Sequence, residues 1–171
     1  MKVFRNILVI ALALLLQSTF FGRFSILGVR PDLAMLVLIL LVSNSGQMES
    51  VLYGFFIGFL QDVYSPEFLG ANAFTMSLMG FFLDLGKERL TVENYSVKAV
   101  VSFIVCVIHD VIFLLLYTKF DSSIMINIFI KESLLGAVYT SILLVVIVMV
   151  WDWAINGGFD FVIQGLFGNR R

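Results

Sequence analysis

The stretch 97–117 holds the residues whose types could do chemistry. Cys106 and His109 are three residues apart and would share one face of a helix, which suits a thiol and its general base. A catalytic thiol also needs positive surroundings and access to water, and no residue can be assigned to an oxyanion site or to a third catalytic group. We therefore expect no enzyme activity. With one Cys and one His in the chain, we also expect no metal and no cofactor.

His109 and Asp110 form an adjacent ionisable pair near the middle of the same stretch. A charged Asp at the centre of a membrane helix costs about 2.5–3.5 kcal/mol on insertion scales, so we expect the pair to face the protein interior and to find a partner there. Three interpretations stay open: a proton or substrate site, a contact for a polar residue of a partner, or a buried pair that fixes helix packing. Adjacent helical residues point about 100° apart, so the two need not act together.

The elements that must position these residues are membrane helices. The chain has 171 residues, of which 60% are hydrophobic and 13% charged, whereas an ordinary soluble domain carries about 25% charged residues. Such a chain cannot cover a globule with polar surface, so its main solvent is lipid. The net charge of −1 supplies no basic field for nucleic acid.

Apolar runs separated by polar breaks predict a single all-α domain, a polytopic integral membrane protein with about six transmembrane helices. The first run follows Lys2 and Arg5 as in a signal peptide, but no cleavage signal follows it, so we expect it to stay attached. The second run is short and could cross the membrane or re-enter. The expected helices cover residues 7–21, 33–46, 51–64, 71–85, 97–117 and 133–153. For residues 157–171 we expect a surface-lying segment or an unstructured tail.

Lys and Arg near the helix ends favour a cytoplasmic location for both termini. If the second run does not cross, the count becomes five and the C-terminal half inverts. The side expected to be cytoplasmic holds Lys2, Arg5, Lys87, Arg89, Lys98, Arg170 and Arg171, and the other side holds Arg23, Arg30, Lys119 and Lys131. The polar connections are too short to fold into domains of their own, so we expect the protein to act within the bilayer.

The third helix carries a stripe of small and polar residues on one face. Ser50, Gly54, Gly58 and Asp62 follow one another at spacings of four, and the two glycines form a small-xxx-small packing pattern. Packing against a helix of the same subunit is the favoured interpretation, and contact with another subunit is the alternative. We expect Asp62, at the end of the stripe, to fix the turn that follows it and to accept a hydrogen bond from that turn or from a partner.

Four segments in order make the central part of the chain recognisable. The segments are Arg30-Pro31-Asp32-Leu33, then Tyr53-Gly54-Phe55-Phe56-Ile57-Gly58-Phe59-Leu60-Gln61-Asp62, then Leu69-Gly70-Ala71-Asn72-Ala73, and Met79-Gly80-Phe81. In order and spacing they resemble MreD, the family of bacterial rod shape-determining membrane proteins. The resemblance covers residues 30 to 81. Lys87, Glu88 and Arg89 depart from the Arg-rich ending that is commoner there, and His109 and Asp110 lie outside the matched part.

The resemblance implies a non-catalytic scaffold or regulator of the cell-elongation machinery for lateral peptidoglycan synthesis, in the bacterial inner membrane. It implies MreC, the actin-like MreB and the peptidoglycan glycosyltransferase and transpeptidase as partners. It also implies a fold similar to the substrate-binding subunits of energy-coupling-factor vitamin transporters. The alternative function is such a subunit itself, binding a vitamin or another small solute. Self-association stays open.

Overall fold

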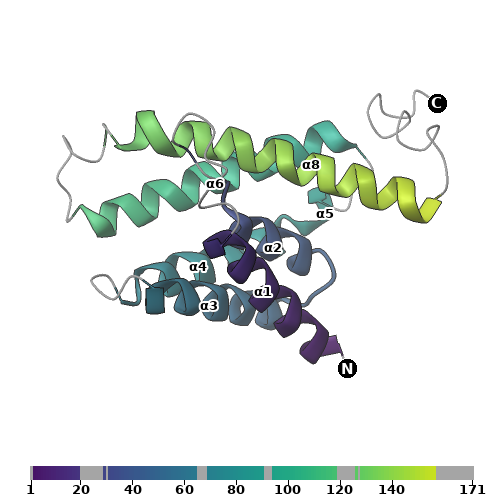
Figure 1. Ribbon diagram of the computed structural model, residues 1–171, viewed down its shortest axis with the longest axis horizontal. Coiled ribbons are helices and arrows are strands. Elements are labelled where there is room, and N and C mark those ends of the chain that lie inside the picture. The colour runs from purple at the N-terminus through teal and green to yellow at the C-terminus, as the bar shows by residue number, and fades with distance from the viewer. Residues whose placement is uncertain are drawn as a thin grey trace.

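The computed structural model describes residues 2–19, 29, 31–64, 69–90, 94–118, 126 and 128–156. Within these ranges every element longer than one residue is helical (Figure 1), which confirms the prediction of an all-α protein. The elements are α1 (Lys2–Thr19), α2 (Leu33–Val42), α3 (Gln47–Tyr64), α4 (Ala71–Leu85), α5 (Lys87–Leu90), α6 (Tyr95–Tyr117), the π-helical turn η2 (Phe129–Ser133) and α8 (Leu134–Asn156).

The helices form two layers with α2 between them. Helices α6 and α8 lie side by side in one layer, and α1, α3 and α4 lie on the other side (Figure 1). Helix α2 contacts helices of both layers, and its residues from Leu33 to Ile39 are all buried. A helix that is apolar on every side is a core helix, so α2 is the centre of the molecule.

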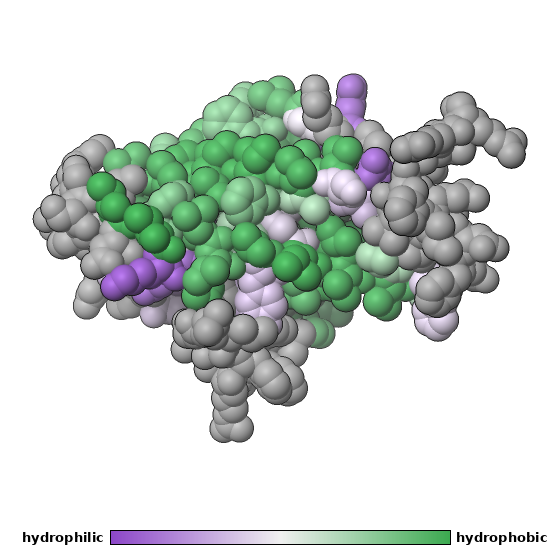
Figure 2. Space-filling model, turned by 90° about the horizontal axis from the view of Figure 1, so that it is seen from above, coloured by the Kyte–Doolittle hydropathy of each residue, from purple (hydrophilic) through white to green (hydrophobic). Residues whose placement is uncertain are grey.

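Within the described residues, two helices are long and apolar enough to cross a membrane. They are α6 and the continuous helix Phe129–Ala154, and most of their apolar surface faces outward rather than into the protein. Hydrophobic residues cover the broad middle of the surface in Figure 2, and hydrophilic residues gather toward its ends. This distribution fits a chain whose middle lies in lipid.

Helix α2 is shorter than expected, because it ends at Val42 rather than at residue 46. The hydroxyls of Ser43 and Ser45 donate to the carbonyls of Ile39 and Leu41, at 3.1 and 2.7 Å, which satisfies the end of the helix while the chain turns. Ten residues rise about 15 Å, which is half of a bilayer core about 30 Å thick. Helix α2 is therefore a half-length helix.

The start of α2 is held by its own N-cap residue and by residues of two other helices. The Asp32 Oδ1 atom accepts a hydrogen bond from the Met35 amide at 3.0 Å as an N-cap. The Gln17 side chain of α1 accepts from the Ala34 amide at 3.1 Å, and the Asp32 amide donates to the Thr140 hydroxyl of α8 at 2.9 Å. The half-length helix thus begins beside the C-terminal end of α1 and beside the second turn of α8.

The other boundaries differ from the expected ones by a few residues. Helix α4 has the expected bounds, whereas α1, α3 and α6 begin earlier, at Lys2, Gln47 and Tyr95. The last helix is preceded by η2, so regular structure begins at Phe129 and extends to Asn156. The short α5 was not expected. The segment 157–171 lies outside the described residues.

Candidate functional site

The small-residue stripe of α3 packs against α4 of the same chain. Ser50, Gly54, Gly58 and Asp62 are all buried. A Cβ atom on Gly54 would overlap the Met76 carbonyl, and one on Gly58 would overlap the Asn72 carbonyl. Gly80 of α4 makes the same kind of contact from the other helix, because a Cβ atom there would overlap the Ser50 carbonyl. The two backbones touch along this face, as small-xxx-small helices do, so α4 occupies the surface that a partner helix would need.

Asp62 ends the stripe and holds the first turn of α4. Its side chain is fully buried. Its Oδ2 atom accepts from the amides of Gly70 and Ala73, at 2.9 and 3.0 Å. Its Oδ1 atom accepts from the amide and the side-chain nitrogen of Asn72, both at 3.0 Å. A carboxylate at a helix N-terminus satisfies amides that have no partner within the helix, so Asp62 has a structural role here.

Other residues that carry the resemblance lie at the starts of α2 and α4. Gly70 has φ of +101°, a conformation that other residues rarely adopt, and Leu69 beside it is exposed. Pro31 is buried directly before the N-cap of α2. Arg30 lies outside the described residues.

His109 and Asp110 contact each other but face different neighbours. The His109 Nδ1 atom is 3.0 Å from the Asp110 carboxylate, and its Nε2 atom is 3.5 Å from the Thr75 hydroxyl of α4. The His109 ring is buried and stacks on Phe113, with centroids 6.2 Å apart. Asp110 is partly exposed. His109 thus links α6 to α4, while Asp110 stays accessible.

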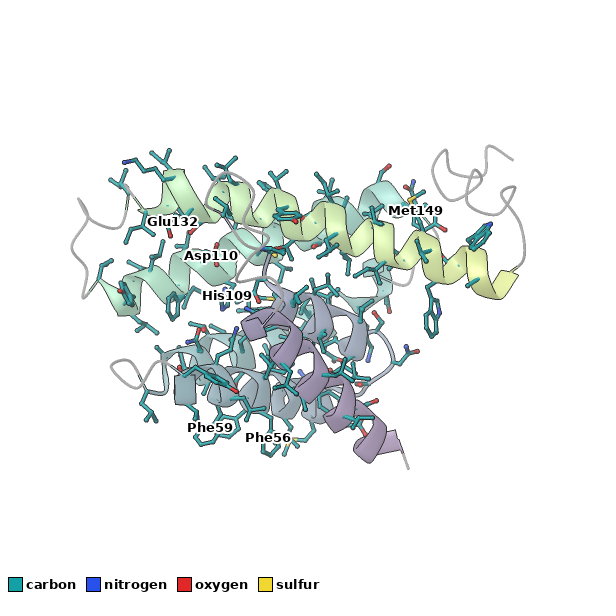
Figure 3. All side chains as sticks on the ribbon, in the orientation of Figure 1. Phe56, Phe59, His109, Asp110, Glu132 and Met149 are labelled. Atoms are coloured by element: carbon teal, nitrogen blue, oxygen red, sulfur yellow. The ribbon has the colours of Figure 1, made fainter. Side chains whose placement is uncertain are left out.

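A polar cavity of about 450 Å³ lies beside this pair, between α6 and the η2–α8 helix. Glu132, Asp110 and His109 follow one another from η2 across α6 toward α4 in Figure 3. We call this space the acidic cavity. It is lined by Val29, Asp32, Cys106, His109, Asp110, Phe113, Leu114, Ile128, Glu132, Ser133, Gly136, Ala137 and Thr140.

These residues come from segments that the sequence pattern alone does not bring together. Asp32 directly precedes the expected helix 33–46 and Glu132 directly precedes the expected helix 133–153, so the pattern placed neither of them beside His109. Gly136 and Thr140 stand four residues apart on one face of the last helix. That stripe, with Glu132 four residues before Gly136, is the signal that could have marked this side of α8 as polar.

Cys106 lines the acidic cavity beside His109, but its surroundings are negative rather than positive. The carboxyl groups of Asp32 and Asp110 line the same space, and negative neighbours oppose the thiolate that a nucleophile requires. Among the residues that the structure describes, no three His, Cys, Asp and Glu side chains are grouped closely enough to hold a metal ion.

Comparison with known proteins assigns the family. A family model described as rod shape-determining protein MreD matches residues 1–152, and the match extends beyond the four recognised segments to include His109 and Asp110. No curated protein and no solved structure matches the chain. The match confirms the family expected from the four segments, and the apolar helices agree with a location in the membrane. The chain belongs to the MreD family of rod shape-determining membrane proteins.

Proposed function

We propose that this protein is a non-catalytic scaffold of the rod-shape machinery in the bacterial inner membrane, and that it acts with MreC. Family membership supports the rod-shape role. The observation that carries the scaffold role is an aromatic surface on the outer side of α3 and α4, left exposed after their glycines have packed together. It is formed by Phe55, Phe56, Phe59, Phe74, Phe81 and Phe82.

This aromatic surface faces away from the rest of the molecule. Phe56 and Phe59 point outward from α3 in Figure 3, and Phe55 stacks on Phe59 with centroids 6.1 Å apart. Aromatic side chains are enriched where proteins bind one another, since they offer large rigid contact areas. We assign this surface to the transmembrane helix of MreC. MreB, on the cytoplasmic side, and the peptidoglycan glycosyltransferase and transpeptidase would join through the same complex.

Many polar side chains of the described residues hold helices together, which suits a rigid scaffold. Asn6 of α1 donates to the Tyr53 hydroxyl of α3 at 2.9 Å. The Tyr95 hydroxyl of α6 donates to Asp152 of α8 at 2.8 Å. These bonds cross between helices that are far apart in the sequence, so they fix the bundle as one unit.

For the topology we propose six crossings with both termini in the cytoplasm. Lys87 places the segment after α2, the end of α4 and the start of α5 at the same end of the bundle. Its ammonium group donates to the Ser45 carbonyl at 3.2 Å and to Asp84 at 2.9 Å. A fold like that of energy-coupling-factor substrate-binding subunits remains part of this proposal.

Depletion in a rod-shaped host tests the scaffold role. Cells that lose this protein should become round, and the same gene supplied in trans should restore rods. Affinity purification of the tagged protein from the rescued cells should recover MreC. Cells that keep their shape and width after depletion would contradict the proposal.

The acidic cavity favours a second candidate, the substrate-binding subunit of a transporter for a vitamin or another small solute. Its volume of about 450 Å³ lies within the range of sites for small ligands. Thermal unfolding of the purified protein with a set of vitamins tests this candidate. A raised melting temperature with one vitamin would support it, and no change with any of them would count against it.

A further inference from the structure

The acidic cavity carries three carboxyl groups that come from three separate segments. Asp32 precedes α2, Asp110 belongs to α6 and Glu132 belongs to η2. Among the residues that the structure describes, no Lys or Arg lines this space, and its one basic side chain is His109, whose Nδ1 atom lies 3.0 Å from the Asp110 carboxylate. Clefts lined by one sign of charge attract ligands of the opposite sign, most strongly where their walls have a low dielectric constant.

Ser133 gives independent evidence that the cavity is built to hold a ligand. Its side chain lines the cavity, and the residue is 8% exposed. Thr140 and Ser141 on the same helix return their hydroxyls to the carbonyls four residues earlier, at 2.9 and 2.7 Å. Within the described part of the chain the Ser133 hydroxyl has no such bond. A buried hydroxyl normally has a partner, and here the open side is the cavity.

The spread of the carboxyl groups selects the type of cation. No three of the described His, Cys, Asp and Glu side chains are grouped closely enough to hold one metal ion, whereas the cavity volume of about 450 Å³ has room for a larger cation. Ammonium and guanidinium groups carry several N–H donors. The Phe113 ring also lines the cavity, but it stacks on His109 and on Tyr117, with centroids 6.2 and 5.8 Å apart, so it forms an apolar wall and leaves the charge to the carboxyl groups.

We propose that the acidic cavity binds a small organic cation that bears an ammonium or guanidinium group. Its N–H groups donate to the carboxylates of Asp110 and Glu132, and to the Ser133 hydroxyl. The cation enters at the end of the molecule where Glu132 is exposed. From His109 to the end of α6 at Tyr117 the helix rises about 12 Å, which gives the depth of the site. This inference rests on the cavity and not on the scaffold role.

Labelling of an introduced thiol tests the charge preference of the cavity. The full chain with Cys106→Ala and Ser133→Cys is purified in detergent micelles. It is treated with 2-aminoethyl methanethiosulfonate, which is cationic, or with 2-sulfonatoethyl methanethiosulfonate, which is anionic. Ser96→Cys is the control, because Ser96 is exposed in the first turn of α6 and outside the cavity. The ratio of cationic to anionic labelling rates should be about tenfold higher at position 133 than at position 96.

Protection by a ligand tests binding itself. The diamine 1,5-diaminopentane should slow labelling at position 133 and leave position 96 unchanged, and 1,5-pentanediol of the same length should protect neither. Glu132→Gln should weaken both the charge preference and the protection. If Ser133→Cys fails to fold, Ile128→Cys reports on the same cavity. Equal rate ratios at the two positions, or no protection by the diamine, would overturn the proposal. Neither result depends on whether depleted cells become round.

Discussion

The carboxylate of Asp62 and the amide of Gly70 are 2.9 Å apart, which joins the end of α3 to the start of α4. Gly70 has φ of +101°, and this left-handed residue brings the amides that follow it toward the carboxylate. The same oxygen accepts from Ala73, so one side chain organises the whole turn. Helices α3 and α4, whose glycine faces pack together, are therefore also joined at one end by hydrogen bonds to Asp62.

Asp62→Asn should destabilise the protein although the shape of the side chain is kept. If the amide nitrogen replaces Oδ2, the amides of Gly70 and Ala73 lose their acceptor, and each buried donor left without a partner costs about 1–3 kcal/mol. Thermal unfolding in detergent should show a clearly lower melting temperature. Asp84→Asn is the control, because Asp84 pairs with the partly exposed Lys87 and such pairs contribute about 0–1 kcal/mol. Equal losses for the two variants would contradict this role for Asp62.

Gly58→Ala should weaken the packing of α3 on α4. The new methyl group would meet the Asn72 carbonyl, which is backbone and cannot rotate away, and overpacking of this kind costs about 1–3 kcal/mol. Gly46→Ala is the control, since a Cβ atom at that position meets nothing within 4 Å. We expect a lower melting temperature for the first variant and little change for the second. Similar melting temperatures for the two variants would show that α3 and α4 can move apart without loss of stability, which would contradict this prediction.

The same contact changes how partner binding must be tested. Large residues at Gly54 and Gly58 would push α4 away from α3, so a loss of MreC binding in such variants would follow from misfolding alone. Substitutions on the exposed side of the hairpin avoid this problem. They leave the contact between the two backbones intact.

Combined replacement of Phe55, Phe56 and Phe59 by Ala should reduce co-purification with MreC while the protein stays folded in the membrane. These side chains are 44%, 54% and 41% exposed, so their loss removes binding surface rather than core. The control replaces Ile142, Val146 and Val150 on α8, which are exposed to a similar degree. Equal recovery of MreC with both variants would exclude the aromatic surface as its binding site.

The sequence predicts most of the helices because lipid demands long apolar segments with saturated backbones. In the part of the chain that the structure describes, the six main helices appear near their expected positions, and α4 has the expected bounds. The length of α2 was overestimated. The hydroxyls of Ser43 and Ser45 were expected to lie within the helix, whereas they close its last turn.

The acidic cavity could not be predicted in the same way, because it depends on which helices become neighbours. Asp32 and Thr140 are 108 residues apart, and a single hydrogen bond joins them. Local patterns show that His109 and Asp110 need partners, but they do not show that Glu132 will line the same space. The placement follows from the half-length α2, whose start is hydrogen-bonded to Thr140 in the second turn of α8.

Thr140 offers a test of this last arrangement. Its hydroxyl donates to the Gly136 carbonyl and accepts from the Asp32 amide, at 2.9 Å in both cases. Thr140→Val keeps the volume but removes the acceptor, and leaves the Asp32 amide without a partner at a cost of about 1–3 kcal/mol. We therefore expect a lower melting temperature, and Thr140→Ser should restore it because the hydroxyl returns. Ser141→Ala is the matched control, since the neighbouring buried hydroxyl of Ser141 donates to Ala137 within its own helix. A Thr140→Val variant as stable as Ser141→Ala would show that α8 does not hold the start of α2.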